Sequence, residues 1–325
     1  MEYARLGSSG LQVSRIALGC MSYGQPDRGT HPWSLPEDEA LPFFKQALDL
    51  GVTFFDTANM YSLGSSEEIT GSAIRRLTRR EDVVLATKVF FPMDGPRSGG
   101  LSRGAILREL DASLRRLGTD YIDLYIIHRW DHETPIDETM QALHDVVRSG
   151  KVRYLGASSM HTWQFVTAQH TADLHGWTRF VSMQNHYNLI NREEEREMLP
   201  YCRAAGVGVT PWSPLARGKL ARDWDETTTR TGGDPIQDAL YAATDQADRA
   251  VAGVVADIAE ERGVPRARVA LAWVLRQPGI TSPIVGATKP HHLADAAAAV
   301  ELALTEDELA RLAAPYVPHA VAGYE

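Results

Sequence analysis

The sequence predicts an α/β protein with a (β/α)8 barrel of the TIM type. Short apolar runs alternate with amphipathic helical stretches from Arg15 almost to the end of the chain, which is the order expected of βαβ units. Most of the apolar runs are continuous rather than alternating, as strands that are buried on both faces require. Eight parallel strands of this kind favour a closed barrel.

Eight strands and eight intervening helices are predicted. The strands are expected at residues 15–19, 52–57, 82–89, 121–128, 152–158, 180–187, 207–212 and 282–286. The helices are expected at residues 36–50, 67–77, 103–117, 135–149, 162–174, 193–205, 266–276 and 290–300. Glycines follow several of these helices directly, where a left-handed C-terminal cap is favoured.

Two segments depart from the regular repeat. Residues 3–6 and 11–14 flank Gly-Ser-Ser-Gly and predict an N-terminal β-hairpin that closes the bottom of the barrel. Residues 216–248, after the seventh strand, are polar and precede an additional helical stretch at 249–262. A loop of that length is typical of a functional or disordered segment, and we expect it to order over a bound cofactor. No low-complexity linker divides the chain, so residues 1–325 are predicted to form one domain.

Composition narrows the class of protein. The chain has 325 residues and a formal net charge of -9, which argues against nucleic acid or an anionic membrane as a partner. Cys20 and Cys202 are its only cysteines, so neither a disulfide framework nor a cysteine metal site is indicated. The sequence has no apolar stretch that predicts a signal peptide or a membrane span, and a cytoplasmic location is expected. It does not indicate an oligomeric state.

Four reactive side chains are expected at one end of the barrel, because catalytic groups gather at the C-terminal ends of barrel strands. Asp56, Lys88 and His128 end the second, third and fourth predicted strands, and Tyr61 follows Asp56 by five residues. Each has an ordinary structural explanation: a turn residue, a paired strand-end lysine, a core histidine and a half-buried loop aromatic. Whether these four side chains are catalytic or only structural depends on whether they can act together in one reaction.

Together the four side chains fit the reduction of a carbonyl by hydride, which leaves an oxyanion that must be protonated. Tyr61 can supply the proton, and a neighbouring Lys88 ammonium would lower the tyrosine pKa from its ordinary value of about 10. Asp56 would keep Lys88 charged and in place. His128 could donate a hydrogen bond to the carbonyl oxygen and stabilise the developing charge.

The order and context of these residues resemble the aldo-keto reductase superfamily over nearly the whole chain, from about residue 3 to 317. Residues 55–71, FDTANMYSLGSSEEITG, are similar to the family's signature around its catalytic aspartate and tyrosine. Together with residues 211–220, PWSPLARGKL, they resemble most the bacterial YajO-like members. The resemblance implies a reductase of aldehydes and ketones that uses NADPH/NADP+, with a small-molecule carbonyl substrate.

The resemblance also implies the cofactor contacts. Gly19, Cys20 and Met21 would line the nicotinamide, which Asp56 adjoins. Ser158, Ser159 and Gln184 would hold the carboxamide, although many members have asparagine in place of Ser159. Trp212 would stack on the nicotinamide ring.

The resemblance implies two further segments for the rest of the cofactor. The turn that contacts the pyrophosphate would comprise Ser213, Pro214, Leu215, Ala216, Gly218 and Lys219. The adenosine segment would comprise Gly286, Thr288, Lys289, His292 and Asp295, with Lys289 on the 2′-phosphate. His292 and Asp295 depart from the family's usual residues, which leaves the strength of the NADPH preference open.

Other site types are weaker alternatives. Neither G-x-G-x-x-G nor a P-loop is present, and the adjacent His291 and His292 would point apart on a helix, so no metal site is predicted. Trp33, Phe90 and Trp130 could form an apolar substrate pocket. Three further arginines near the barrel mouth could attract an anionic substrate, but a role as solvated surface residues is favoured: Arg97, Arg129 and Arg217.

Two alternative functions remain beside the reductase. One is an NADPH-binding regulatory subunit on the same fold with little turnover, and the other is an unrelated barrel enzyme such as a sugar-phosphate isomerase. The complete tetrad and the Trp212 segment favour the reductase. The sequence does not identify the physiological substrate.

Overall fold

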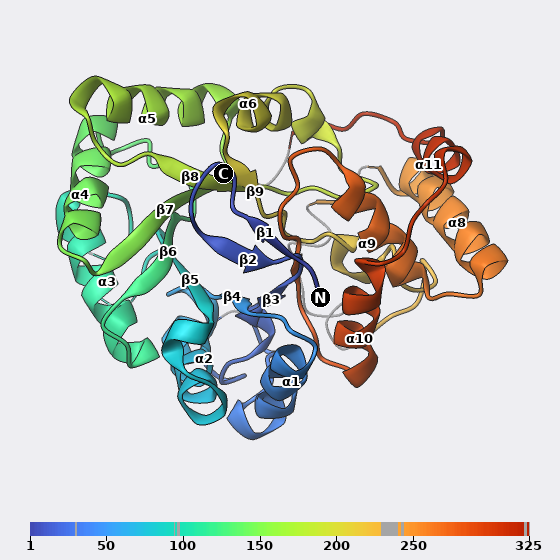
Figure 1. Cartoon of the computed structure of the whole chain (residues 1–325), viewed down its shortest axis with the longest axis horizontal. Helices are drawn as coiled ribbons and strands as arrows, with labels where there is room; N and C mark the ends of the chain where they lie inside the picture. The colour runs from blue at the N-terminus through green and yellow to red at the C-terminus, as the bar shows by residue number, and fades with distance from the viewer. Residues whose placement is uncertain are drawn as a thin grey trace.

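The predicted barrel is present in a computed structural model that describes residues 1–29, 31–93, 95, 98–228, 240–241, 244–321 and 324. Its main sheet has eight strands in the order β10-β3-β4-β5-β6-β7-β8-β9, and helices surround it (Figure 1). All neighbouring pairs are parallel. The strands are β3 (Ala17–Gly19), β4 (Phe54–Asp56), β5 (Val84–Val89), β6 (Ile122–Ile127), β7 (Val152–Ser158), β8 (Phe180–Gln184), β9 (Gly208–Val209) and β10 (Ile284–Val285).

Backbone hydrogen bonds close the ring between β9 and β10. Thr281 N donates to Val209 O at 2.8 Å, and Ile284 N donates to Pro211 O at 2.9 Å. Most of the strands are shorter than predicted, and β9 and β10 span two residues each. Apolar sequence continues beyond the regular pairing there, which is why the strand bounds could not be deduced from composition.

The predicted helices are present with small changes of bounds. The additional stretch begins earlier than expected, at Asp245, and the helix predicted at 193–205 is divided into η4 (Glu193–Glu195) and α6. A last helix, α11, was not predicted, although Thr305 and Glu308 form a capping box at its start. The helices are α1 (Glu37–Asp49), α2 (Ser65–Leu77), α3 (Arg103–Leu117), α4 (Ile136–Arg148), α5 (Thr162–His175), α6 (Met198–Ala205), α8 (Asp245–Arg262), α9 (Arg266–Arg276), α10 (Pro290–Ala299) and α11 (Glu306–Ala313).

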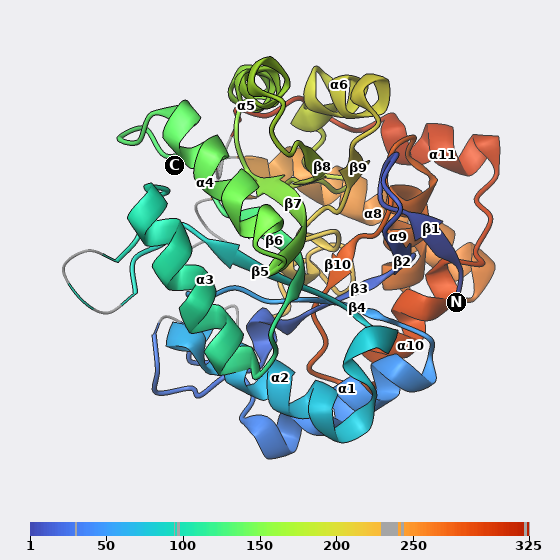
Figure 2. The same ribbon diagram turned by 60° about the vertical axis from the view of Figure 1, so that its left-hand side comes forward.

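The N-terminal hairpin closes the bottom of the barrel, as predicted. Strands β1 (Tyr3–Arg5) and β2 (Gln12–Ser14) pair antiparallel, and Figure 2 shows them at the same end of the molecule as the start of β9. Leu6 and Val13 are fully buried in the inner cluster of the barrel with residues such as Phe54. A larger apolar cluster fills the layer between strands and helices. The barrel is thus packed inside, and its open end is the one where the strands finish.

Part of the long segment after β9 lies outside the described residues, namely 229–239, 242 and 243. The prediction that residues 216–248 order over a cofactor falls partly on that stretch and stays a prediction. Within the described part of the chain, none of the helices has the length and apolar character needed to cross a membrane.

Close contact between α2 and α3 gives a testable prediction of stability. A Cβ atom on Gly71 would lie 2.0 Å from Leu117 O, which is backbone. We expect Gly71→Ala to lower the free energy of unfolding by about 1–3 kcal/mol, because the two helices must separate to admit the methyl group. Chemical denaturation measures this change.

The matched control is Gly104→Ala, also within a helix, where an added Cβ would have no atom within 4 Å. There the substitution should be neutral or stabilising by about 0.4–1 kcal/mol, since alanine favours the helix. Equal effects at both positions would contradict the tight packing of α2 on α3.

Candidate active site

The four predicted catalytic residues meet at the C-terminal end of the barrel. Lys88, near the end of β5, donates from Nζ to Asp56 Oδ1 at 2.5 Å and to Thr57 O at 2.8 Å. The same ammonium donates to Tyr61 Oη at 3.2 Å. Asp56 ends β4, and the Lys88–Asp56 ion pair is almost completely buried, with side-chain exposures of 0% and 3%. Lys88 therefore links the carboxylate and the phenol, as the sequence predicted.

Burial and neighbouring charges oppose each other in the pKa values of Lys88 and Tyr61. Burial lowers the pKa of Lys88, but the charges and hydrogen bonds of Asp56 and Tyr61 outweigh it, so this pKa is raised and the ammonium is retained. Burial also raises the pKa of Tyr61, and Lys88 offsets that effect only in part. The predicted influence of Lys88 on Tyr61 has the expected direction, but the net shift is upward. Without a ligand, the phenol stays protonated at neutral pH.

His128 and its aromatic neighbours form the wall beside Tyr61. The Tyr61 and His128 rings meet edge to face with centroids 5.8 Å apart, and Phe91 packs edge to face on His128 at 4.9 Å. Burial, followed by the charges of Lys88 and Arg129, holds the pKa of His128 well below its usual range. Its imidazole is therefore neutral, and a neutral ring can still donate one hydrogen bond.

Polar side chains at the ends of β7 and β8 continue the site from Asp56. Gln184 donates from Nε2 to Asp56 Oδ2 at 2.9 Å, and Ser158 Oγ donates to Gln184 O at 2.9 Å. Ser158 and Ser159 hydroxyls lie 3.1 Å apart, and Trp212 Nε1 donates to Ser159 Oγ at 3.0 Å. The structure thus connects the residues expected around a nicotinamide carboxamide to the Asp56 carboxylate.

One face of Trp212 is covered by His186. The two rings stack with centroids 4.2 Å apart and an interplanar angle of 8°, and Tyr241 Oη lies 2.7 Å from His186 Nε2. Asn188 donates to Ser213 O at 2.9 Å and so ties this buried cluster to the turn after Trp212. A flat aromatic face fixed from behind is suited to stacking on a planar ring.

The turn after Trp212 has the shape of an anion cradle. Ser213, Ala216 and Arg217 have positive φ values of 51°, 48° and 55°, and Gly218 has a φ of 99°. Short left-handed turns of this kind form concavities that bind phosphate groups. The other predicted members, Pro214, Leu215 and Lys219, lie in the same turn, where η5 spans Ala216–Gly218.

Arg222, which the sequence analysis missed, connects this turn with the start of α10. Its Nη2 donates to Arg217 O at 3.4 Å, and a Cβ on Gly218 would meet its guanidinium. Burial lowers the pKa of His292 to about 4, helped by the charges of His291, Lys289 and Arg222. Lys289 and Arg222 thus both place positive charge near His292, between the two predicted cofactor segments.

The remaining predicted cofactor residues differ in whether they are exposed to a ligand or already paired within the chain. Gly286, Thr288 and Lys289 are exposed at the start of α10, and Thr288 N donates to His292 Nδ1 at 3.2 Å. Asp295 is instead paired with Arg268 of α9 at 3.0 Å, so its carboxylate already has a partner. Arg268 was not predicted, because a helical arginine far away in sequence gives no local signal.

The segment after β3 can contact a cofactor through its main chain, but the Cys20 thiol in it is not reactive. Gly19 is fully packed, and a Cβ there would lie 2.8 Å from Ile284 Cγ2. Cys20 is completely buried, and burial raises the pKa of its thiol to about 12. Met21 is half-buried beside it. Of the three residues predicted to line a nicotinamide, Cys20 can contribute only main-chain atoms.

The family follows from comparison with known proteins. The model of the aldo/keto reductase family matches residues 15–316. The chain belongs to this family. It is 47% identical to the versiconal hemiacetal acetate reductase of Aspergillus parasiticus over 99% of this chain and 98% of that protein. It is 44% identical to aldo-keto reductases of Metarhizium robertsii, over 100% of this chain and 93% of that protein, and of Alternaria alternata, over 97% and 91%.

These findings support an oxidoreductase with a small-molecule carbonyl substrate. The relatives named above are fungal, so the predicted closeness to bacterial YajO-like members is not shown and stays a prediction. Family members share the barrel, and the tetrad geometry described above is compatible with the chemistry expected of the family.

The predicted substrate pocket is only partly assembled as expected. Trp33 packs on His31, which contacts Tyr61 edge to face at 5.8 Å. Trp130 packs against Trp163 of α5 at 6.1 Å and lies at the rim. The ring next to His128 belongs to Phe91, not to Phe90. Phe90 packs edge to face on Phe91 with ring centroids 5.3 Å apart, and its part in a substrate pocket stays a prediction.

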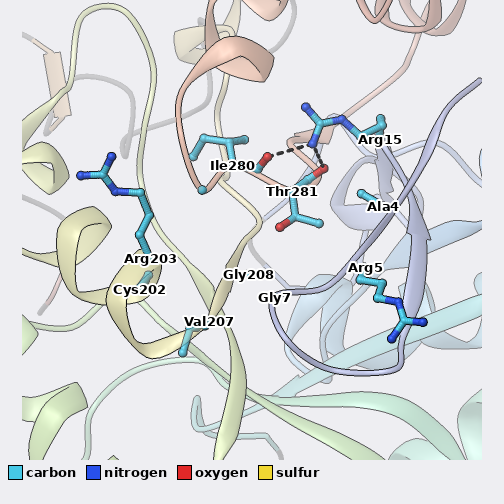
Figure 3. A pocket seen from close by; sticks show the side chains of 12 residues that line it. Ala4, Arg5, Gly7, Arg15, Cys202, Arg203, Val207, Gly208, Ile280 and Thr281 are labelled. Carbon is cyan, nitrogen blue, oxygen red and sulfur yellow. Dashed lines mark hydrogen bonds between the residues drawn. The ribbon is translucent and has the colours of Figure 1, made fainter.

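A second concave region lies at the other end of the barrel. A cavity of about 350 Å³ opens between the hairpin, the start of β9 and the segment before β10, and Figure 3 shows its lining. Arg15 crosses this region and donates to Ile280 O and Thr281 O at 2.9 and 3.0 Å. None of the four tetrad residues lines it. This cavity lies at the end of the barrel where the strands begin, and the predicted catalytic residues lie at the opposite end.

Proposed function

We propose that this chain is an NADPH-dependent reductase that converts aldehydes or ketones to alcohols in the cytoplasm, with Tyr61 as the proton donor. The observation that carries the proposal is the buried triad in which one ammonium contacts both Asp56 and the Tyr61 phenol. A bound NADPH would supply the hydride. What the chain must supply is a place for the carbonyl, a proton and protection of the developing charge.

The protein side of the reaction follows from the positions of these groups. A carbonyl oxygen placed between Tyr61 and His128 would accept hydrogen bonds from both side chains. As negative charge develops on that oxygen, the phenol transfers its proton, and the nearby Lys88 stabilises the phenolate that remains. Asp56 keeps Lys88 charged and in place, so the ammonium is already positioned beside the Tyr61 oxygen when the phenolate forms.

The proposed cofactor contacts rest on the chemistry of the side chains that the structure groups together. Ser158, Ser159 and Gln184 provide hydroxyl and amide groups suited to a carboxamide. Trp212, supported by His186, provides the flat face for the ring. The turn from Ser213 to Lys219 and the start of α10 would bind the phosphates and the adenosine.

The direct test measures oxidation of NADPH by absorbance with a panel of aromatic aldehydes, dicarbonyls and sugar aldehydes. Turnover of at least one class with kcat/KM of about 10³ M⁻¹s⁻¹ or more is expected of a working enzyme. Tight NADPH binding without turnover of any carbonyl would contradict the proposal and favour a regulatory subunit. Absence of NADPH binding would exclude both.

Cofactor preference gives a second prediction. Lys289→Ala should weaken NADPH binding by about 1–3 kcal/mol and leave NADH binding nearly unchanged, since only NADPH carries the 2′-phosphate. Fluorescence titration with both cofactors measures this. Lys45→Ala, which removes an exposed lysine of α1 that pairs with Asp49, should change neither affinity. Equal losses for both cofactors at Lys289 would place the 2′-phosphate elsewhere.

A further inference from the structure

Arg129 is held against the wall that His128 and Phe91 form beside Tyr61, rather than in solvent. It follows His128 directly after β6, and its Nη1 donates to His128 O at 2.7 Å. Its guanidinium carbon lies 5.4 Å from the centroid of the Phe91 ring, which in turn packs on His128. The sequence favoured a solvated surface position for Arg129, with attraction of an anionic substrate as the alternative, but its side chain is only partly exposed.

This arginine has no counter-charge within the described chain. No carboxylate of the described residues forms an ion pair with it, and its Nε is buried without a hydrogen-bond partner. The nearest acid in the sequence, Asp131, is engaged elsewhere. Its carboxylate accepts from Leu101 N at 2.7 Å, Glu133 N at 2.9 Å and Thr134 Oγ1 at 2.7 Å.

The positive charge is also close enough to influence the tetrad. Burial lowers the pKa of Arg129 and Tyr61 raises it, while Arg129 contributes to lowering the pKa of both Tyr61 and His128. Lys88 is neutralised by Asp56, so among the described residues of this wall Arg129 is the cation that remains unbalanced. A partly desolvated guanidinium without an anion is unfavourable unless a ligand supplies one.

We propose that Arg129 binds the carboxylate of the substrate, and that this chain prefers carbonyl compounds that also carry a carboxylate. The inference rests on the proposed function and deepens it by naming a substrate class. With Nη1 already fixed on His128 O, the planar guanidinium still offers donors in the fork geometry that matches a carboxylate. The nearby rings of Phe91 and Trp130 suit an aromatic body between the carbonyl and the acid.

The test compares acids with their neutral counterparts. The wild-type protein is assayed with 2-, 3- and 4-carboxybenzaldehyde and with the three corresponding methyl esters, which keep the reacting aldehyde and differ in charge. We expect kcat/KM to favour at least one acid over its ester by about tenfold or more. The preferred isomer then reports the spacing between the carbonyl and Arg129.

Substitution of the arginine should remove that preference. Arg129→Gln is expected to lower kcat/KM for the preferred acid by about 10- to 100-fold, mainly through KM, and to lower it clearly less for the ester, which lacks the charge that the guanidinium binds. Arg129→Lys should retain part of the preference, because it keeps the charge but not the fork. Thermal unfolding of each variant verifies that it is folded.

Two results would overturn the inference while leaving the proposed function intact. One is a wild-type enzyme that reduces acids and esters equally well. The other is an Arg129→Gln variant that loses activity equally on acids and esters and whose alkaline limb of kcat is shifted. That result would assign Arg129 to the Tyr61 phenol instead.

If no aldehyde is reduced at all, the proposed function fails. Binding of benzoate, followed by tryptophan fluorescence, then decides the inference separately: binding that Arg129→Gln abolishes supports it, and no binding, or binding that the variant leaves unchanged, overturns it.

Discussion

Tyr61→Phe is expected to lower kcat by a factor of about 100 or more and to leave NADPH binding nearly unchanged. The substitution removes only the phenolic oxygen, which lies 3.2 Å from Lys88 Nζ. The remaining ring can keep its edge-to-face contacts with His128 and His31 at centroid distances of 5.8 Å each. The loss should therefore be chemical rather than structural.

The measurement combines steady-state kinetics with a fluorescence titration of NADPH. Tyr3→Phe is the matched control, because that phenol donates to Gly51 O at 2.9 Å on the hairpin side of the barrel. Its kcat should equal that of the wild type. Turnover of the Tyr61 variant within a few-fold of the wild type would reject Tyr61 as the acid and shift attention to His128 or to a water.

The architecture was accessible from the sequence because strands buried on both faces leave continuous apolar runs. The same property concealed the strand ends: Thr210 and Pro211 continue the run after β9, which spans Gly208–Val209, without regular pairing. Helix α11 follows the last barrel helix, where the counting of βα units gives no reason to look further. Its capping box was the available signal.

The catalytic set was also accessible, because each of its members is tied to a strand end or to the loop that follows one. The supporting residues were not. His186 covers the back of Trp212, and Phe91 contacts His128, through packing that only the folded chain defines. Arg268 reaches its partner Asp295 from a different helix, 27 residues away in the sequence. Such contacts carry no local pattern.

The net pKa shift of Tyr61 could not be predicted from the sequence either. The sequence correctly indicated that Lys88 would lower the pKa of Tyr61, but not that burial would exceed this effect. Burial depends on how completely the barrel and the loops after β3, β5 and β6 surround the phenol. The balance between a desolvation effect and one neighbouring charge is a property of the packed site.

Lys88→Met is the second substitution with a large expected effect, and it should act on both activity and stability. Removal of the cation leaves the Asp56 carboxylate buried with 3% of its side chain exposed, which is expected to lower the free energy of unfolding by about 3–5 kcal/mol. kcat should also fall by a factor of about 100 or more, because the phenolate of Tyr61 loses its stabilising neighbour.

The pH dependence separates these two effects. Lys88 lowers the pKa of Tyr61, so its removal raises that pKa, and the alkaline limb of the residual kcat should move to higher pH. The pKa of Lys88 itself is raised in the folded state. Its contribution to stability in the wild type is therefore fully present below its unfolded pKa of about 10.4 and is lost as the pH rises through the folded value.

The double variant Asp56→Asn/Lys88→Met is the decisive comparison. Replacing the carboxylate by an amide removes the unpaired buried charge, so much of the lost stability should return, as measured by urea unfolding. Activity should not return, since the amide supplies no positive charge to stabilise the phenolate. If the double variant recovered both stability and kcat, Lys88 would be a structural partner of Asp56 alone, and the assignment of its ammonium to the Tyr61 phenol would be wrong.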